Sequence, residues 1–221
     1  MKLFVDTANL SEIQNVLETG TISGITTNPS LLAKEPKGDF FVHIEKIVNI
    51  CRNSDNMPLS VEVFAKDAKN MYEQALEIYD RLEYSNLNIK IPIGYEEIKV
   101  VNLLANRGID VNCTCCFTAS QLELAALAGA RYVSLFYNRL LDVQGNPLKV
   151  LRKTNKFIDT NDLNCEIIAG SIRKAYDVSS AWNSGAHIVT AGYKVITEMT
   201  KHYQTDNSVQ GFLSDFEGWI E

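Results

Sequence analysis

The sequence predicts an α/β fold, a single-domain (β/α)8 TIM barrel with an additional C-terminal helix. Three observations predict it: the 221-residue chain has eight short apolar runs, helix-patterned segments separate them, and most runs are apolar almost throughout. Strand, helix and strand in regular order imply parallel strands with helical crossovers. Nearly continuous apolar strands are typical of a sheet buried on both faces, and eight such units fit a closed barrel. An open doubly wound sheet is the main alternative, but no G-x-G-x-x-G turn follows the first run.

The expected strands lie in runs that are mostly rich in Val, Ile, Leu or Phe. These runs are Lys2–Thr7, Gly24–Asn28, Leu59–Ala65, Leu87–Ile93, Asp110–Cys116, Tyr132–Arg139, Cys165–Ser171 and His187–Ala191. Between them, segments such as 68–82 and 98–105 carry apolar residues at spacings of three and four, which predicts helices. We expect one domain, 1–221, in which 203–221 is a helical extension.

The C-terminal segment carries an apolar stripe that needs a surface to cover it. Its spacing of three, four and three puts Val209, Phe212, Phe216 and Trp219 on one helical face. Packing on its own barrel and docking on a neighbouring subunit are both consistent with this pattern.

Composition limits the classes of function. The net charge of −6 argues against a nucleic-acid-binding surface. Asp6 interrupts the apolar core that a signal peptide would need, and no long uncharged run suggests a membrane segment, so we expect a cytoplasmic protein. The five cysteines are expected to be reduced and mostly buried, with no metal site. Strand alternation would put Cys113 and Cys115 on one face and Cys116 on the other.

Polar side chains interrupt the apolar runs at positions that a closed barrel brings together. They are Asp6, Asn28, Glu62, Lys90, Asn112, Thr114, Ser134 and Ser171. A charged residue in a barrel strand is costly unless it is paired or takes part in chemistry. Active sites of barrels are built at the carboxyl ends of the strands. Asp6, Glu62 and Lys90, on three different strands, therefore indicate one convergent site.

Lys90 lies in Asn88-Ile89-Lys90-Ile91-Pro92, among apolar neighbours. Desolvation disfavours the ammonium form of a lysine, so more neutral amine is available to attack a carbonyl. The other interpretation of these residues is an interior ion pair of Lys90 with Glu62 or Asp6. Two carboxylates beside one amine also suit carbinolamine formation, dehydration and C–C cleavage, because each moves a proton at a different atom.

A second group of residues predicts a phosphate site. Gly170-Ser171-Ile172-Arg173 is expected to close the seventh strand and open a helix, where backbone N–H groups and the helix dipole attract anions. Arg139 is expected to end the sixth strand. Strand alternation along the sixth run would put Ser134, Phe136 and Asn138 on one face. Two guanidinium groups beside a helix start form a phosphate clamp; taken alone, two surface arginines are the alternative.

Seven motifs spread over nearly the whole chain carry a resemblance to a known family. They are Phe4-Val5-Asp6-Thr7-Ala8, Gly24-Ile25-Thr26-Thr27-Asn28-Pro29-Ser30, Val61-Glu62-Val63, Ile89-Lys90-Ile91-Pro92, Asn112-Cys113-Thr114, Asn138-Arg139 and Gly170-Ser171-Ile172-Arg173. In these motifs the sequence resembles the transaldolase family, and within it the short subfamily of transaldolase C-like proteins and fructose-6-phosphate aldolases.

The resemblance implies a barrel enzyme without metal or organic cofactor that moves a dihydroxyacetone unit between sugar phosphates in the pentose phosphate pathway. The donors would be sedoheptulose 7-phosphate or fructose 6-phosphate, and the acceptors glyceraldehyde 3-phosphate or erythrose 4-phosphate. By position, Lys90 matches the Schiff-base lysine. Asp6 matches the carboxylate that takes and returns the C4 hydroxyl proton. Glu62 and Thr114 match the pair that holds the catalytic water.

The resemblance also implies the substrate-binding residues. Residues matching those that bind the dihydroxyacetone hydroxyls are Asn28, Asn112 and Ser134, and residues matching the phosphate clamp are Arg139, Ser171 and Arg173. A ring-shaped homo-oligomer, commonly a decamer, is implied as well, with the C-terminal helix reaching a neighbour.

Two positions separate transferase from aldolase in this family. Fructose-6-phosphate aldolases carry glutamine at the position of Glu62 and tyrosine at that of Phe136, so the resemblance favours a transaldolase. A phenylalanine leaves a drier pocket in which the intermediate waits for an aldehyde, and Tyr137 would point to the opposite face. An aldolase that releases free dihydroxyacetone is the alternative. A barrel that only binds is the third hypothesis, against which the intact catalytic set argues.

Overall fold

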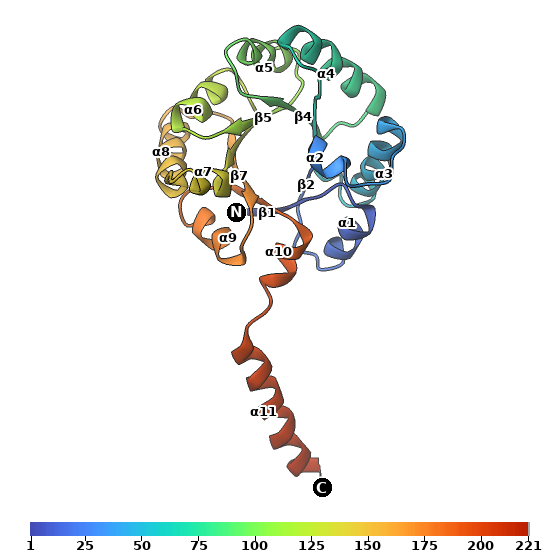
Figure 1. Ribbon diagram of the computed structural model, residues 1–221, viewed down its shortest axis with the longest axis vertical. Helices are drawn as coiled ribbons and strands as arrows, with labels where there is room; N and C mark the ends of the chain where they lie inside the picture. Colours follow the sequence, from blue (N-terminus) through green and yellow to red (C-terminus); the bar gives the residue numbers. More distant parts are fainter. Residues whose placement is uncertain (221) are drawn as a thin grey trace.

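The computed structural model describes residues 1–220 and confirms the predicted (β/α)8 barrel. Eight parallel strands pair in sequence order, and β8 closes the barrel on β1. Helices surround this ring of strands (Figure 1). The strands, one in each predicted run, are β1 (Lys2–Asp6), β2 (Ile25–Thr26), β3 (Leu59–Glu62), β4 (Leu87–Pro92), β5 (Val111–Cys116), β6 (Tyr132–Phe136), β7 (Glu166–Ile172) and β8 (Ile188–Ala191).

Short polar side chains start many of the helices. Asn9, Asn28, Asp39, Asp67 and Asn146 each accept a backbone N–H three residues ahead, which satisfies a donor that the first helical turn leaves free. The helices are α1 (Leu10–Leu17), α2 (Pro29–Leu32), α3 (Phe40–Asn53), α4 (Ala68–Leu82), α5 (Glu97–Ala105), α6 (Ala119–Leu127), α7 (Tyr137–Asp142), α8 (Pro147–Thr160), α9 (Ala175–Trp182), α10 (Tyr193–Glu198) and α11 (Tyr203–Ile220).

Strand alternation divides the barrel interior into an apolar layer and a polar layer. The apolar layer contains a buried cluster of Phe4, Tyr132, Ile168 and Ile188. A side chain at Gly24 would collide with the Phe4 ring, so that position requires glycine. Two residues further along the same strand faces stand Asp6, Ser134, Gly170 and Thr190. The polar layer is therefore at the carboxyl ends of the strands, where barrels build their sites.

The predicted sixth strand is too long. It ends at Phe136, whose pairing with Gly170 is the last contact of β6 with β7, and α7 begins at Tyr137. Tyr137 and Leu140, three residues apart, are both buried, so the apolar pattern there is helical. Asn138 consequently does not continue the strand face of Phe136, and Arg139, expected to end the strand, lies on a helix.

The cysteine-rich strand also departs from simple alternation. The register of β5 against β6 shifts between Cys113 and Cys116, and Cys115 adopts a left-handed φ of 60°. This irregularity buries both Cys113 and Cys116, while Cys115 remains partly exposed. The prediction that Cys113 and Cys115 share one face is therefore wrong. All five cysteines are free thiols.

Helix α11 projects away from the barrel (Figure 1), and none of its described residues is buried. Packing of the apolar stripe on its own barrel, one of the two alternatives, is not observed. Within residues 1–220, no helix combines the length and apolar character needed to cross a membrane.

Candidate active site

The predicted site residues come together in a cavity of about 260 Å³ at the carboxyl ends of the strands. Ten of the eleven line it directly: Asp6, Asn28, Lys90, Asn112, Thr114, Ser134, Phe136, Arg139, Ser171 and Arg173. The eleventh, Glu62, contacts Lys90 from the neighbouring strand. Residues spread over most of the chain thus meet at one place, as the barrel topology requires.

Lys90 stands in the interior polar layer and carries the closest charge contact of the site. In the register of β3 against β4 it lies directly opposite Glu62. Its Nζ lies 3.0 Å from a carboxylate oxygen of Glu62 and donates to the carbonyl oxygen of Thr27 at 2.8 Å. The side chains of Lys90 and Glu62 are 7% and 14% exposed. The interior ion pair that the sequence left open is therefore present, with a proton acceptor within hydrogen-bonding reach of the amine.

Asp6 ends β1 and faces the same cavity. Burial raises the pKa of its carboxyl above the ordinary value; Lys90 and a hydrogen bond from the Thr26 hydroxyl at 2.7 Å oppose the shift. The Thr26 hydroxyl also lies 2.6 Å from that of Thr190. Sequence reasoning missed both threonines, although the signal was available, because each is a polar residue inside a strand run. A carboxyl whose charged form is disfavoured is suited to taking and returning a proton.

A chain of polar side chains crosses the middle of the cavity. The Ser134 hydroxyl donates to Asn112 Oδ1 at 2.6 Å, and Asn112 Nδ2 donates to the Ser60 hydroxyl at 3.1 Å. These bonds fix the orientation of the Asn112 amide. The Thr114 hydroxyl is buried without a hydrogen-bond partner among the described residues. A buried polar group of this kind is costly unless a ligand or water bonds it.

Asn28 has a structural task as well as its expected one. Its side-chain oxygen caps α2 by accepting the N–H of Leu31 at 3.0 Å. The amide nitrogen is the part of the side chain left for a ligand. The cap also fixes the start of α2, whose residues Ser30 and Leu31 line the cavity.

The predicted phosphate clamp lies on α7 and on the segment between β7 and α9. Arg139 places its guanidinium over the Phe136 ring, 4.7 Å from its centre. Arg173 makes a forked ion pair with Asp142, with nitrogen–oxygen distances of 2.9 and 2.8 Å. Ser171 has a left-handed φ of 57°. The expected helix does not begin directly after Arg173; α9 begins at Ala175.

Asn138 and Asp177 position this clamp. Asn138 Nδ2 donates to an Asp177 carboxylate oxygen at 2.9 Å, and its Oδ1 accepts the backbone N–H of Arg173 at 2.9 Å. Both side chains are buried. No sequence pattern predicts this pairing, because the two residues lie 39 positions apart on α7 and α9.

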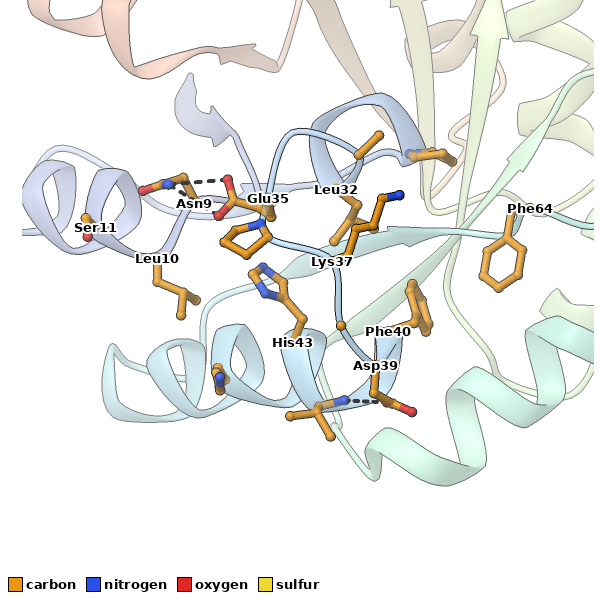
Figure 2. Close-up of a pocket in the computed structure, with 16 residues that line it drawn as sticks. Asn9, Leu10, Ser11, Leu32, Glu35, Lys37, Asp39, Phe40, His43 and Phe64 are labelled. Carbon is orange, nitrogen blue, oxygen red and sulfur yellow. Dashed lines mark hydrogen bonds between the residues drawn. The ribbon is translucent and has the colours of Figure 1, made fainter.

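A larger groove of about 920 Å³ lies between α1, α3 and the segment after α2. Figure 2 shows Leu10, Phe40 and His43 around it, with the Asn9 amide directed at the Glu35 carboxylate. None of the eleven predicted site residues lines it. The polar cavity, although smaller, is therefore the candidate active site.

Comparison with known proteins agrees with this geometry. A family model described as "Transaldolase/Fructose-6-phosphate aldolase" matches residues 3–219. The chain belongs to this family. Similar proteins called "Probable transaldolase" include one from Caldicellulosiruptor saccharolyticus, 43% identical over 219 residues, and one from Clostridium botulinum (strain Hall), 42% identical over 218. A third, from Thermoanaerobacter sp. (strain X514), is 41% identical over 216 residues. Each alignment covers 98% of this chain and 97% of the relative.

Membership confirms the family expected from the sequence and makes the chain an enzyme of the transaldolase type. The expected sugar-phosphate substrates are consistent with that family. Among residues 1–220, no cluster of His, Cys, Asp and Glu has the arrangement of a metal site.

Proposed function

We propose that this enzyme transfers a dihydroxyacetone unit between sugar phosphates through an imine on Lys90. The observation that carries the proposal is the pairing of Lys90 Nζ with the Glu62 carboxylate at 3.0 Å inside a cavity that Asp6 also faces. An amine must lose a proton before it attacks a carbonyl carbon. Glu62 is within reach of that proton, so the resting ion pair is also the arrangement for the first proton transfer.

The reaction follows from these groups. The neutral amine of Lys90 attacks the ketone carbon C2 of fructose 6-phosphate or sedoheptulose 7-phosphate, and loss of water from the carbinolamine gives the imine. Asp6 takes the proton of the C4 hydroxyl while the C3–C4 bond breaks. The electron pair of that bond moves into the imine to give an enamine. The aldose phosphate leaves. An acceptor aldehyde then forms the new C–C bond, Asp6 returns the proton, and hydrolysis of the imine frees Lys90.

Polar residues around Lys90 suit the three-carbon unit. Asn112, oriented by Ser134 and Ser60, can bind its hydroxyls with a fixed amide. The unpartnered hydroxyl of Thr114 supports a role in holding a water near the imine together with Glu62.

Transfer is favoured over release of free dihydroxyacetone by Phe136. Its ring lies edge-on to that of Phe117, with centroids 5.8 Å apart, and beneath the Arg139 guanidinium. This wall of the cavity therefore presents no hydroxyl that could protonate the enamine carbon. Tyr137 does not supply one from the neighbouring position, because it is buried in the core, where desolvation raises its pKa to about 12.

Borohydride trapping tests the proposal. Reduction in the presence of fructose 6-phosphate should add one dihydroxyacetone unit to Lys90, detected by peptide mass spectrometry, and Lys90→Met should abolish it. Lys99→Met, an exposed lysine on α5, is the matched control and should still trap. An unmodified Lys90 in the wild-type chain would end the imine proposal. Measuring erythrose 4-phosphate-dependent transfer beside dihydroxyacetone release separates transaldolase from the aldolase alternative; no turnover in either assay would favour the binding-only barrel.

We also propose a homo-oligomer, of the decameric kind that the resemblance implies, in which α11 of one copy lies in the large groove of another. Helix α11 exposes Phe212, Phe216 and Trp219 and contains acidic but no basic residues. The groove offers an apolar wall that includes Phe64, 57% exposed, and its charged lining residues are Lys37 and Lys46 beside Glu35 and Asp39. Apolar contact favours this pairing.

Light scattering tests the assembly. Removal of residues 203–221, the segment that we propose to treat as an extension of the barrel domain, should reduce the number of subunits per particle, and Lys46→Glu should weaken the oligomer. An unchanged number of subunits after truncation would contradict α11-mediated assembly. We also propose the cytoplasm and the pentose phosphate pathway as the setting, the first as expected from the sequence and the second as the family resemblance implies.

A further inference from the structure

The phosphate clamp is short of positive charge. Arg173 directs two guanidinium nitrogens at the Asp142 carboxylate, so its charge is largely balanced within the protein. Arg139, stacked on Phe136, makes no ion pair among the described residues. A phosphate monoester carries a charge of about −1.5 to −2 at neutral pH. The two arginines therefore leave roughly one uncompensated positive charge for nearly two negative ones.

Lys34 is a further cation on the same cavity. It follows the C-cap of α2, and its backbone N–H donates to the Leu31 carbonyl at 3.1 Å. The side chain is exposed and lines the cavity together with Arg139 and Arg173. Within residues 1–220 its ammonium group has neither an ion-pair nor a hydrogen-bond partner. Because Asn28 caps α2, the helix that precedes Lys34 has a fixed starting point at the end of β2.

Asp6 does not account for Lys34. Desolvation raises the pKa of Asp6. Lys90, the Thr26 hydrogen bond and Lys34 all lower this pKa, and the effect of Lys34 is the weakest of the three. The Lys34 charge is thus near enough to act on an anion in the cavity but is not committed to this carboxylate. A phosphate between α2 and α7 would satisfy it.

We propose that Lys34 is the third cation of the phosphate site and that it makes the enzyme select phosphorylated over unphosphorylated acceptor aldehydes. This inference rests on the proposed function. Lys34 would act as a point charge on the phosphate, while the planar arginines provide directional hydrogen bonds. Because the phosphate is remote from the reacting carbons, losing this contact should weaken acceptor binding more than the chemical step.

Acceptor kinetics test the proposal, with fructose 6-phosphate saturating as donor for each enzyme. Lys34→Gln should raise KM for glyceraldehyde 3-phosphate about tenfold, the effect of one charge-assisted hydrogen bond, with kcat changed less than about twofold. For unphosphorylated glyceraldehyde, kcat/KM should stay within about twofold of the wild type. Lys34→Arg should recover most of the loss because it restores the charge. Lys66→Gln, an exposed lysine after β3, is the control and should behave as wild type.

The outcomes separate this inference from the proposed function. Borohydride trapping of unphosphorylated dihydroxyacetone on Lys90 should be equal in wild type and Lys34→Gln, which also shows that the variant is folded. An equal loss of kcat/KM for both acceptors, or no loss for either, overturns the role of Lys34 while leaving the imine mechanism intact. A wild-type chain that neither traps nor transfers overturns the proposed function and this inference with it.

Discussion

Replacing Glu62 with glutamine tests whether the partner of Lys90 is a proton carrier or only an ion-pair partner. The substitution keeps the shape and can keep a hydrogen bond at the observed 3.0 Å, but it removes the charge and the basic oxygen. General acid–base groups contribute about 10²–10⁴ to a rate, or roughly 3–5 kcal/mol of barrier. We therefore expect Glu62→Gln to lower the kcat of transfer from fructose 6-phosphate to erythrose 4-phosphate by at least about 100-fold.

The effect on the free energy of unfolding should be smaller than that on the activation barrier. At an effective dielectric constant of about 20, two charges 3 Å apart attract by about 5.5 kcal/mol, but burial of both side chains offsets most of this. We expect the unfolding free energy to fall by roughly 1–3 kcal/mol, measured by denaturant titration. Glu45→Gln, on the exposed side of α3, is the control for transfer and stability. A kcat within fivefold of wild type, with stability lowered, would refute the proton-carrier role and leave only the ion pair.

Three further predictions concern Phe136, Asp6 and His187. Glu62→Gln combined with Phe136→Tyr should raise the ratio of dihydroxyacetone release to transfer about tenfold or more; an unchanged ratio would count against the role assigned to Phe136. The acidic limb of the kcat–pH profile should lie above the ordinary aspartate range, because burial raises the pKa of Asp6 and only its ionised form can accept a proton. Thr26→Val removes a hydrogen bond that lowers this pKa, so the limb should move to higher pH; a shift to lower pH would exclude Asp6 as its source. Finally, burial lowers the pKa of His187, whose Nδ1 accepts the N–H of Ile167 at 2.9 Å. Its stabilising contribution should be complete above the unfolded-state pKa, about 6.5, and should decline as the pH falls from there through the lower folded-state pKa; thermal melts of wild type and His187→Gln should converge at acid pH.

Much of the barrel and its site could be predicted because both follow from a period of two. Apolar runs mark the strands, and a polar residue in such a run stands out against its neighbours. Asp6, Lys90 and Asn112 are of this kind, and a closed parallel barrel brings the carboxyl ends of all strands together without further information. The site could therefore be assembled from single positions on separate strands.

What could not be predicted depends on where the pattern changes period or on contacts between distant segments. The run from Tyr132 to Arg139 stays largely apolar although the backbone changes from strand to helix at Tyr137, so period two was extended too far. The pairing of Asn138 with Asp177 joins two helices, and no local pattern marks it. The direction of α11 could not be predicted either, because an apolar stripe is the same whichever surface covers it.

The sequence leaves two interpretations of Lys90, an interior ion pair and a nucleophilic amine, and the observed geometry is compatible with both. An interior ion pair and a nucleophilic amine are competing interpretations only if the lysine keeps one protonation state. At 3.0 Å, one proton moving from Nζ to the Glu62 oxygen converts the first state into the second without moving either heavy atom far. The ion pair compensates the cost of burying the two charges in the resting enzyme. Under the proposed imine mechanism, arrival of a carbonyl carbon would favour the neutral amine, and Glu62 would both stabilise the resting state and prepare the attack. The same contact explains why loss of Glu62 should affect the reaction more than the fold.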